Sequence, residues 1–188
     1  MNRSKMAYNT AARYMDILCD SYLFERASRY DIKGRRMLGT PSKYYAADVG
    51  LRNVRLNFRQ QEPTPLMENI IYNELRSRDY RVDVGLVEHR ETVDGKQEYR
   101  QLEIDFVVNR GDSRWYIQST YGIPDSGKME QETRPFRKVP DSFRRILVVD
   151  DDVRPRTDDN GVLIVGIKDF LLDEGIMDRL EIDSQLLL

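Results

Sequence analysis

Two acidic residues, Glu103 and Asp105, stand two positions apart in the stretch "RQLEIDFVVNRGDSRWYIQSTYGI", residues 100–123. Apolar and polar residues alternate on both sides of "RGDS", which predicts two antiparallel strands joined by a four-residue loop. That loop places Asp105 opposite Gln118. Carboxylates suit hard cations such as Mg²⁺ and Mn²⁺, which prefer oxygen ligands. The hairpin therefore leaves three interpretations open: a metal site, what remains of one, or a polar face of a sheet.

The two elements that would position these acids are the hairpin and a helix ahead of it. Strand alternation predicts Glu103, Asp105 and Val107 on one face. The opposite face would be an apolar ridge made of Leu102, Ile104, Phe106 and Val108. Glu68 lies at the edge of the apolar stripe of the predicted helix in "LMENIIYNELRSRDY". We therefore expect one helix carboxylate and one strand carboxylate to converge.

Other kinds of chemistry lack the residues they need. The single histidine, His89, lies in a predicted strand, so neither a catalytic triad nor a zinc site of the Cys/His type is supported. The single cysteine, Cys19, excludes an intrachain disulfide. No glycine-rich loop ends in Gly-Lys-Ser or Gly-Lys-Thr, so we expect no ATP site in this chain.

Composition describes a globular chain without a strong global field. Its 188 residues include 30 Lys+Arg and 32 Asp+Glu, a formal net charge of -2. A nucleic-acid surface would therefore have to come from a local patch. There is no long apolar run and no signal-peptide pattern, so we expect a cytoplasmic protein with no membrane partner.

The first of two predicted domains covers residues 1–58. Apolar residues at three- and four-residue spacing predict a helix from Tyr8 that ends near Ser21. Two β-rich stretches follow, with turns expected near Gly34 and near Gly39 to Pro41. A helix followed by such a hairpin resembles the back half of a winged helix, so we expect a partial winged-helix-like segment.

The hairpin of this segment is basic. Between Glu25 and Lys43 there are six basic residues and two acidic ones. The basic residues, which are the candidates for contact with nucleic acid, are Arg26, Arg29, Lys33, Arg35, Arg36 and Lys43. A solvated wing without a ligand is the alternative, because a basic cluster is only a footprint of nucleic-acid binding.

The second predicted domain covers residues 64–188 and begins after the proline-containing stretch "NFRQQEPTPL". Its first helix has Thr64 as the expected N-cap. Periodicity then predicts three strands, the first two joined by a turn at Asp94 and Gly95, followed by a helix, two strands and a helix. The fold class is thus α/β, a mixed α+β sheet with helices on both faces.

Four motifs in this order, "RYDIKG", "KYYAADVGLRN", "ENIIYNELRSRDY" and "EIDFVV", give the chain a resemblance. It resembles the C-terminal domain of unknown function found behind many predicted prokaryotic AAA-type ATPases, within the PD-(D/E)XK nuclease-like superfamily. The resemblance implies a restriction-endonuclease-like core, and it implies an ATPase domain or subunit as a partner. It also implies that Glu68 is the helix glutamate and Asp105 the metal-binding aspartate of a Mg²⁺ site.

The third motif of that superfamily departs from the pattern. Where an acid and a lysine would stand, this chain has Gln118 and Thr120. Glutamine offers a metal only a neutral carbonyl, and threonine cannot replace an ammonium that stabilises charge on phosphate. Lys128 and Lys138 are the candidates for a lysine that has migrated from elsewhere in the chain.

Three functions follow as hypotheses. The first is a non-catalytic nuclease-like module that associates with DNA, aided by basic residues near the far edge: Arg134, Arg137, Lys138, Arg144 and Arg145. The second is a protein-interaction domain that docks onto an ATPase. The third is a Mg²⁺-dependent nuclease with a migrated lysine.

Overall fold

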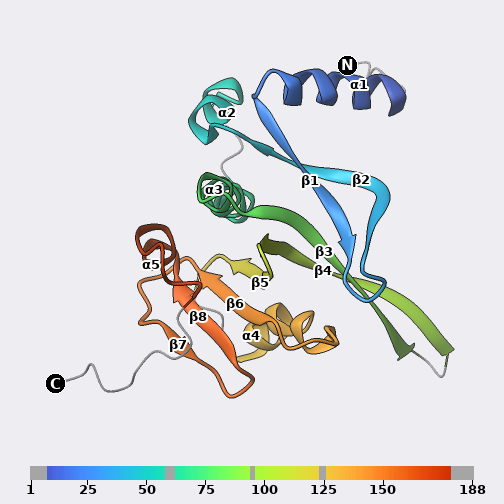
Figure 1. The fold of residues 1–188 in the computed structure, drawn as a ribbon, viewed down its shortest axis with the longest axis vertical. Helices are drawn as coiled ribbons and strands as arrows, with labels where there is room; N and C mark the ends of the chain where they lie inside the picture. Colours follow the sequence, from blue (N-terminus) through green and yellow to red (C-terminus); the bar gives the residue numbers. More distant parts are fainter. Residues whose placement is uncertain (1–7, 58–61, 94–95, 123–125, 179–188) are drawn as a thin grey trace.

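The structure is a computed structural model that describes residues 8–57, 62–93, 96–122 and 126–178. In these residues eight strands form one mixed sheet in the order β2-β1-β3-β4-β5-β6-β8-β7 (Figure 1). The strands are β1 (Phe24–Asp31), β2 (Arg36–Ala46), β3 (Arg81–Val93), β4 (Lys96–Arg110), β5 (Ser113–Thr120), β6 (Arg144–Val149), β7 (Arg156–Thr157) and β8 (Val162–Gly166). The helices are α1 (Tyr8–Asp20), α2 (Val49–Arg55), α3 (Pro63–Ser77), α4 (Ser126–Thr133) and α5 (Ile167–Leu172), with a 3₁₀ turn η1 (Phe136–Lys138).

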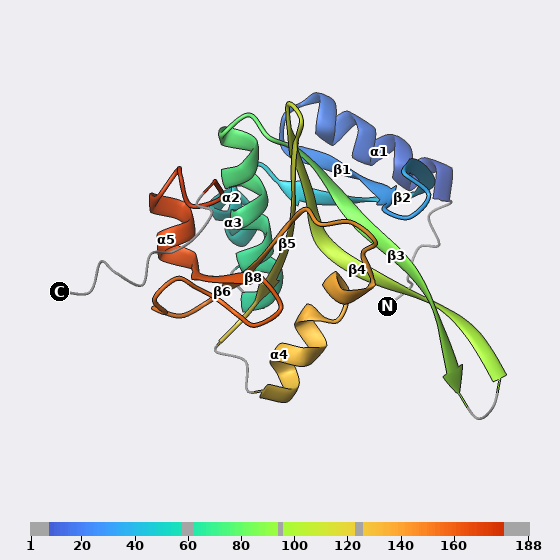
Figure 2. The same cartoon turned by 60° about the horizontal axis from the view of Figure 1, so that its bottom comes forward.

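Helices cover both faces of the sheet, as the sequence predicts for an α/β fold. One apolar cluster, which we call the α3-side cluster, joins α3 and α5 to the sheet through residues such as Ile71, Phe106 and Phe170. The other, the α4-side cluster, joins the sheet to α4 and η1 through Val107, Tyr116, Phe136 and other residues. Figure 2 shows α3 and α4 on opposite sides of the sheet.

The predicted order of helices and strands in the second half of the chain is confirmed, with β7 as an additional short strand. The predicted hairpin register is confirmed, since Asn109 pairs with Arg114, but the predicted four-residue loop is wrong. Arg110 also pairs with Ser113, so only Gly111 and Asp112 lie between the two strands. The predicted turn at Asp94 and Gly95 lies outside the described residues.

The predicted alternation of faces along β4 is wrong. The pairing of β3 with β4 shifts register between Asp83 and Gly85, so one extra β4 residue is accommodated in a bulge. A bulge resets the alternation of side chains. Ile104 and Val107 therefore both belong to the α4-side cluster, whereas Phe106 belongs to the α3-side cluster. Glu103 and Asp105 consequently do not share a face with Val107.

The basic hairpin β1–β2 belongs to the same sheet as the second half of the chain. β1 pairs in parallel with β3, Arg29 with Val84. The turn at Gly34 is confirmed, but the turn predicted at Gly39 to Pro41 is wrong, because those residues lie inside β2, where the register shifts. Proline lacks an N–H donor, and edge strands with bulges tolerate it. The division into residues 1–58 and 64–188 stays a prediction.

Helix α3 begins at Pro63, two residues earlier than a cap at Thr64 would allow. Glu62 is the N-cap and Pro63 occupies the first turn, so the prediction of Thr64 as N-cap is wrong. Proline suits that position because the first N–H groups of a helix have no partner inside it. The short helix α2, capped by the Asp48 side chain, was not predicted. Across the described residues, the helices lack the length and apolar character of a membrane span.

Candidate functional site

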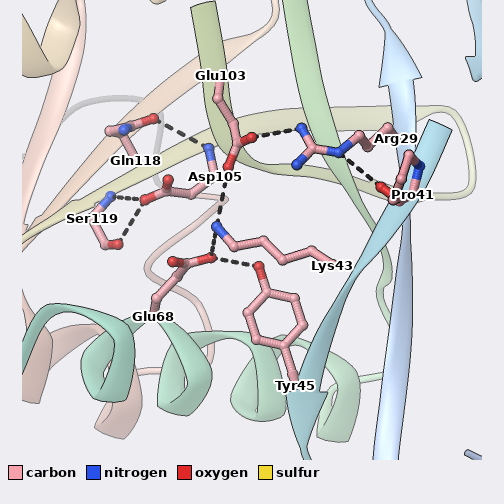
Figure 3. Close-up of polar contacts among 9 residues, drawn as sticks. All are labelled: Arg29, Pro41, Lys43, Tyr45, Glu68, Glu103, Asp105, Gln118 and Ser119. Carbon is pink, nitrogen blue, oxygen red and sulfur yellow. Dashed lines mark hydrogen bonds and ion pairs between the residues drawn. The ribbon is translucent and has the colours of Figure 1, made fainter. Parts of the chain in front are cut away.

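A lysine lies between the acidic side chains that the sequence singles out. Helix α3 supplies Glu68, β4 supplies Glu103, and β2 supplies Lys43. The Lys43 Nζ atom is 2.6 Å from Glu68 Oε1 and 3.1 Å from Glu103 Oε1. Figure 3 shows the ammonium pointing into the space between the two carboxylates, with Asp105 beside them. These contacts tie the first hairpin to α3 and to the centre of the sheet.

Tyr45 lies two residues after Lys43 on β2, on the same face of the strand. Because side chains alternate along a strand, Lys43 and Tyr45 both point toward α3. The Tyr45 hydroxyl donates a hydrogen bond to Glu68 Oε1 at 2.5 Å, and its ring stacks on Tyr72 at 4.0 Å between centroids. Burial, followed by the charge of Glu68, raises the pKa of Tyr45, so the hydroxyl remains a donor. Glu68 is thus held by a lysine and a tyrosine from one strand.

Arg29 on β1 completes the environment of Glu103. Its Nη1 donates to Glu103 Oε2 at 2.7 Å, while its Nε donates to the Pro41 carbonyl at 3.0 Å. Burial by itself would raise the pKa of Glu103, but Lys43 and Arg29 outweigh it and hold that pKa below its ordinary value. Burial would lower the pKa of Lys43, yet the charge of Glu68 raises it. Both groups are therefore charged at neutral pH.

Asp105 is held in a different way, by neutral donors. The backbone N–H and the hydroxyl of Ser119 donate to Asp105 Oδ2 at 2.8 Å and 2.7 Å. The Asp105 backbone N–H in turn donates to Gln118 Oε1 at 3.2 Å. Burial and then the nearby charge of Glu68 raise the pKa of Asp105 to about 7, although Ser119 and Lys43 oppose the shift. Asp105 therefore titrates near neutral pH.

The structure brings together most of the residues that the resemblance implies. Glu68, Asp105 and Gln118 lie in one neighbourhood, while Thr120 is buried and its hydroxyl faces Glu132 Oε1 at 3.5 Å. The lysine at the site is Lys43, which the sequence reading placed among the candidates for nucleic-acid contact. The motif "KYY" did contain a signal for this position of Lys43. Strand alternation places Lys43 and Tyr45 on one face, so a charged side chain is expected beside an aromatic ring.

The two lysines considered for migration lie elsewhere in the fold. Lys128 Nζ donates to the Tyr121 carbonyl at 2.8 Å. Lys138 lies in η1, beside Arg134 and Arg137. Arg134 in turn contacts Glu91 at 2.8 Å, so part of the basic far edge is paired within the chain.

Most cations of the basic hairpin also have partners within the chain. Arg26 pairs with Asp16, and Lys33 donates to the Glu88 carbonyl. Arg29 and Lys43 belong to the site just described. Arg35 and Arg36 are exposed at the turn, and Arg36 Nε lies 3.6 Å from Asp31 Oδ2. The hairpin is therefore less available to phosphate than its composition indicates.

The site does not fit a divalent cation as it stands. Mg²⁺ needs oxygen ligands in a near-octahedral arrangement. Here the Lys43 ammonium already contacts Glu68 and Glu103, and the Ser119 hydroxyl donates a hydrogen bond to Asp105 Oδ2. Within the described residues no three His, Cys, Asp or Glu side chains are grouped as a metal site requires. A metal would have to displace the ammonium.

Comparison with known proteins finds a family model that matches part of the chain, and a relative. Residues 2–62 match the family model of a domain of unknown function, DUF8612. An uncharacterized protein of Haemophilus influenzae is 30% identical over 164 residues, which is 87% of this chain and 37% of that protein. The chain therefore spans well under half the length of this relative.

A solved structure, protein VC1899 from Vibrio cholerae, is similar over 91% of this chain and 42% of its own, with 12% identity and a TM-score of 0.40. That likeness is too weak to carry over a fold or an activity. None of these names mentions a nuclease, an ATPase or DNA, so these parts of the resemblance stay predictions.

Proposed function

We propose that the chain is a non-catalytic, nuclease-like domain that associates with nucleic acid. The observation that supports it is the position of the Lys43 ammonium between Glu68 and Glu103. In a metal-dependent nuclease two or more carboxylates hold a cation that activates water and stabilises the phosphate. Here a covalently attached cation takes that place, with Gln118 standing where a further acid would be.

In this proposal the restriction-endonuclease-like core and the winged-helix-like segment are inferences from the resemblance. The mixed sheet with helices on both faces is compatible with such a core. The arrangement of β1 beside β3 makes the basic hairpin an extension of the core sheet rather than a separate wing. An ATPase domain or subunit is the proposed partner, and co-purification after nuclease treatment would separate a protein contact from a contact bridged by DNA.

A second candidate, a Mg²⁺-dependent nuclease, draws support from the same lysine. Lys43 brings to Glu68 and Asp105 the ammonium that Thr120 cannot supply. If Lys43 swung toward a bound phosphate, the carboxylates would be released for a metal ion. The two candidates therefore differ in whether Lys43 stays paired when nucleic acid and metal are both present.

The experiment that separates them is a cleavage assay on plasmid and on labelled linear duplex with Mg²⁺ or Mn²⁺. We expect no cleavage by the wild-type chain. Cleavage that is lost in both Asp105→Asn and Lys43→Met would overturn the proposal and support the nuclease. The association itself is measured by fluorescence anisotropy between low and physiological salt, because phosphate contacts make binding steeply salt-dependent. No binding at low salt would remove the nucleic-acid part.

A further inference from the structure

A cavity of about 430 Å³ opens where three turns and strand ends meet, away from the Lys43 site. Its walls come from the β1–β2 turn, the start of β3 and the turn between β4 and β5. Tyr30, which lines it, packs against the α4-side cluster, so the cavity lies on the sheet face opposite α3. The residues that matter to the argument are Arg35, Arg36, Arg81, Asp83, Asn109 and Arg114.

Four guanidinium groups therefore line one cavity together with a single lining carboxylate, that of Asp83. Arg81 Nε lies 3.4 Å from Asp83 Oδ2, and Arg36 Nε lies 3.6 Å from Asp31 Oδ2, both long for a charge-assisted hydrogen bond. The side chains of Arg36 and Arg81 are 73% and 70% exposed. Each keeps most of its five N–H donors available to a ligand.

Arg114 is positioned at this cavity by neutral groups. Its Nε donates to Asn109 Oδ1 at 2.7 Å and its Nη1 donates to the Tyr30 hydroxyl at 3.3 Å. The guanidinium also lies 4.9 Å from the centroid of the Tyr30 ring. Within the described residues no carboxylate lies within ion-pair distance of Arg114. A cation that is oriented by hydrogen bonds to neutral groups is a preorganised site for an anion.

We propose that this cavity binds phosphodiester groups of a nucleic-acid strand through Arg36, Arg81 and Arg114. A planar guanidinium matches a phosphate with two parallel hydrogen bonds, and contacts of this kind fix a strand without reading its sequence. Several arginines from separate strands suit a ligand with regularly spaced charges better than they suit a single carboxylate. The identity of the ligand rests on the proposed function, whereas the existence of an anion site here does not.

The test compares two double variants of the full chain. Arg36→Gln with Arg81→Gln removes two charges from the cavity. Arg154→Gln with Arg156→Gln removes two exposed charges near β7, the opposite edge strand of the sheet. Each is titrated against labelled single-stranded and duplex oligonucleotides, inorganic pyrophosphate and a glutamate-rich peptide, with circular dichroism confirming the fold.

We expect the cavity variant to bind single strands about tenfold more weakly at moderate salt, with a salt slope shallower by about 1.4, which corresponds to two lost phosphate contacts. The control variant should have a salt slope that differs from the wild-type slope by less than about 0.7. Equal behaviour of the two variants toward oligonucleotides would overturn this inference while leaving the proposed function in place.

The other ligands separate the remaining outcomes. Pyrophosphate binding without oligonucleotide binding, lost in the cavity variant alone, would keep the anion site but overturn its assignment to nucleic acid. Peptide binding in preference to oligonucleotides would assign the cavity to an acidic protein partner and overturn the inference. No binding of any probe by the wild-type chain would overturn the anion site itself.

Discussion

At the scale of single residues, the carboxyl groups of the site divide into two kinds. Glu103 is paired with two cations, and its pKa is lowered. Asp105 accepts hydrogen bonds from Ser119 beside the charge of Glu68, and its pKa is raised to about 7. The two groups therefore make opposite contributions to the pH dependence of folding.

Asp105→Asn is expected to stabilise the protein at alkaline pH. Near pH 3 and below, under the ordinary pKa value of 3.8, the Asp105 carboxyl is mostly protonated in both the folded and the unfolded chain. As the pH rises toward 7, the unfolded chain releases this proton while the folded chain keeps it, so the free energy of unfolding falls. Asparagine keeps an acceptor for Ser119 and cannot ionise. Urea unfolding at pH 8 should show a gain of up to about 4 kcal/mol that disappears near pH 3.

The matched control is Glu103→Gln, for which the sign is reversed. A lowered pKa means that the ionised carboxylate stabilises the folded chain above pH 4.5 and loses this effect as the pH falls. The variant should lose about 1 kcal/mol at pH 7 and match the wild type in acid. A parallel pH dependence in both variants would show that neither carboxyl has the environment described here.

Lys43→Met is expected to weaken the fold and to create affinity for a divalent cation. The change leaves Glu68 and Glu103 without their shared ammonium, which should cost about 2 kcal/mol of unfolding free energy for a half-buried pair. Mn²⁺ should then raise the melting temperature of the variant, because a ligand stabilises the state that binds it. Equal effects of Mn²⁺ on the variant and on the wild type would contradict the view that Lys43 takes the place of a metal.

At the scale of elements, the bulge between β3 and β4 is what orients the acidic pair. It lies beside Gly85, where a Cβ atom would come within 2.8 Å of Val107 Cγ2 and 2.9 Å of Ile32 Cδ1. A glycine in a strand marks a close approach of this kind. The bulge brings Asp105 to Ser119 and leaves Val107 on the other face.

Gly85→Ala should therefore destabilise the protein by about 2 kcal/mol, because the core around the bulge has no room for a methyl group. Gly39→Ala is the control, since a Cβ atom there meets nothing within 4 Å. The two variants are compared by urea denaturation at one pH. If Gly85→Ala unfolds at the same midpoint as Gly39→Ala, the packing around the bulge is looser than the structure describes.

At the scale of the whole molecule, the first hairpin and the second half of the chain share one core. Tyr45 on β2 stacks on Tyr72 of α3, and both rings lie near Phe106 of β4. The Asn69 side chain also accepts from the Ala46 N–H and donates to the Ala46 carbonyl, each at 2.9 Å. The buried N–H and carbonyl groups of Ala46 thus depend on a side chain of α3 for their hydrogen bonds, which ties β2 to α3.

A fragment of residues 62–188 is consequently expected to lose cooperative unfolding. Removing β1 and β2 exposes Tyr72 and leaves Glu68 and Glu103 without their cations. The fragment should bind a dye specific for exposed apolar surface, and its urea transition should be broad beside that of the full chain. A sharp transition with little dye binding would support the two-domain division predicted from the sequence.

The sequence by itself determined the local features of this protein. Periodicity located α1, α3 and the second-half strands, and alternation around "RGDS" set the pairing of Asn109 with Arg114, because these patterns depend on neighbours along the chain. It also singled out Glu68 and Asp105. What it could not supply was the partner of these acids.

The tertiary structure alone decided that partner. Parallel pairing of β1 with β3 joins segments more than fifty positions apart, and no local pattern encodes such a contact. That pairing brings the basic hairpin beside α3, where Lys43 meets Glu68 and Arg29 meets Glu103. The bulge beside Gly85 then resets the faces of β4, at a position where the packing leaves no room for a Cβ atom. The basic residues of the first hairpin are thereby divided into two groups. Arg29 and Lys43 pair with carboxylates inside the fold, whereas Arg35 and Arg36 line the open cavity.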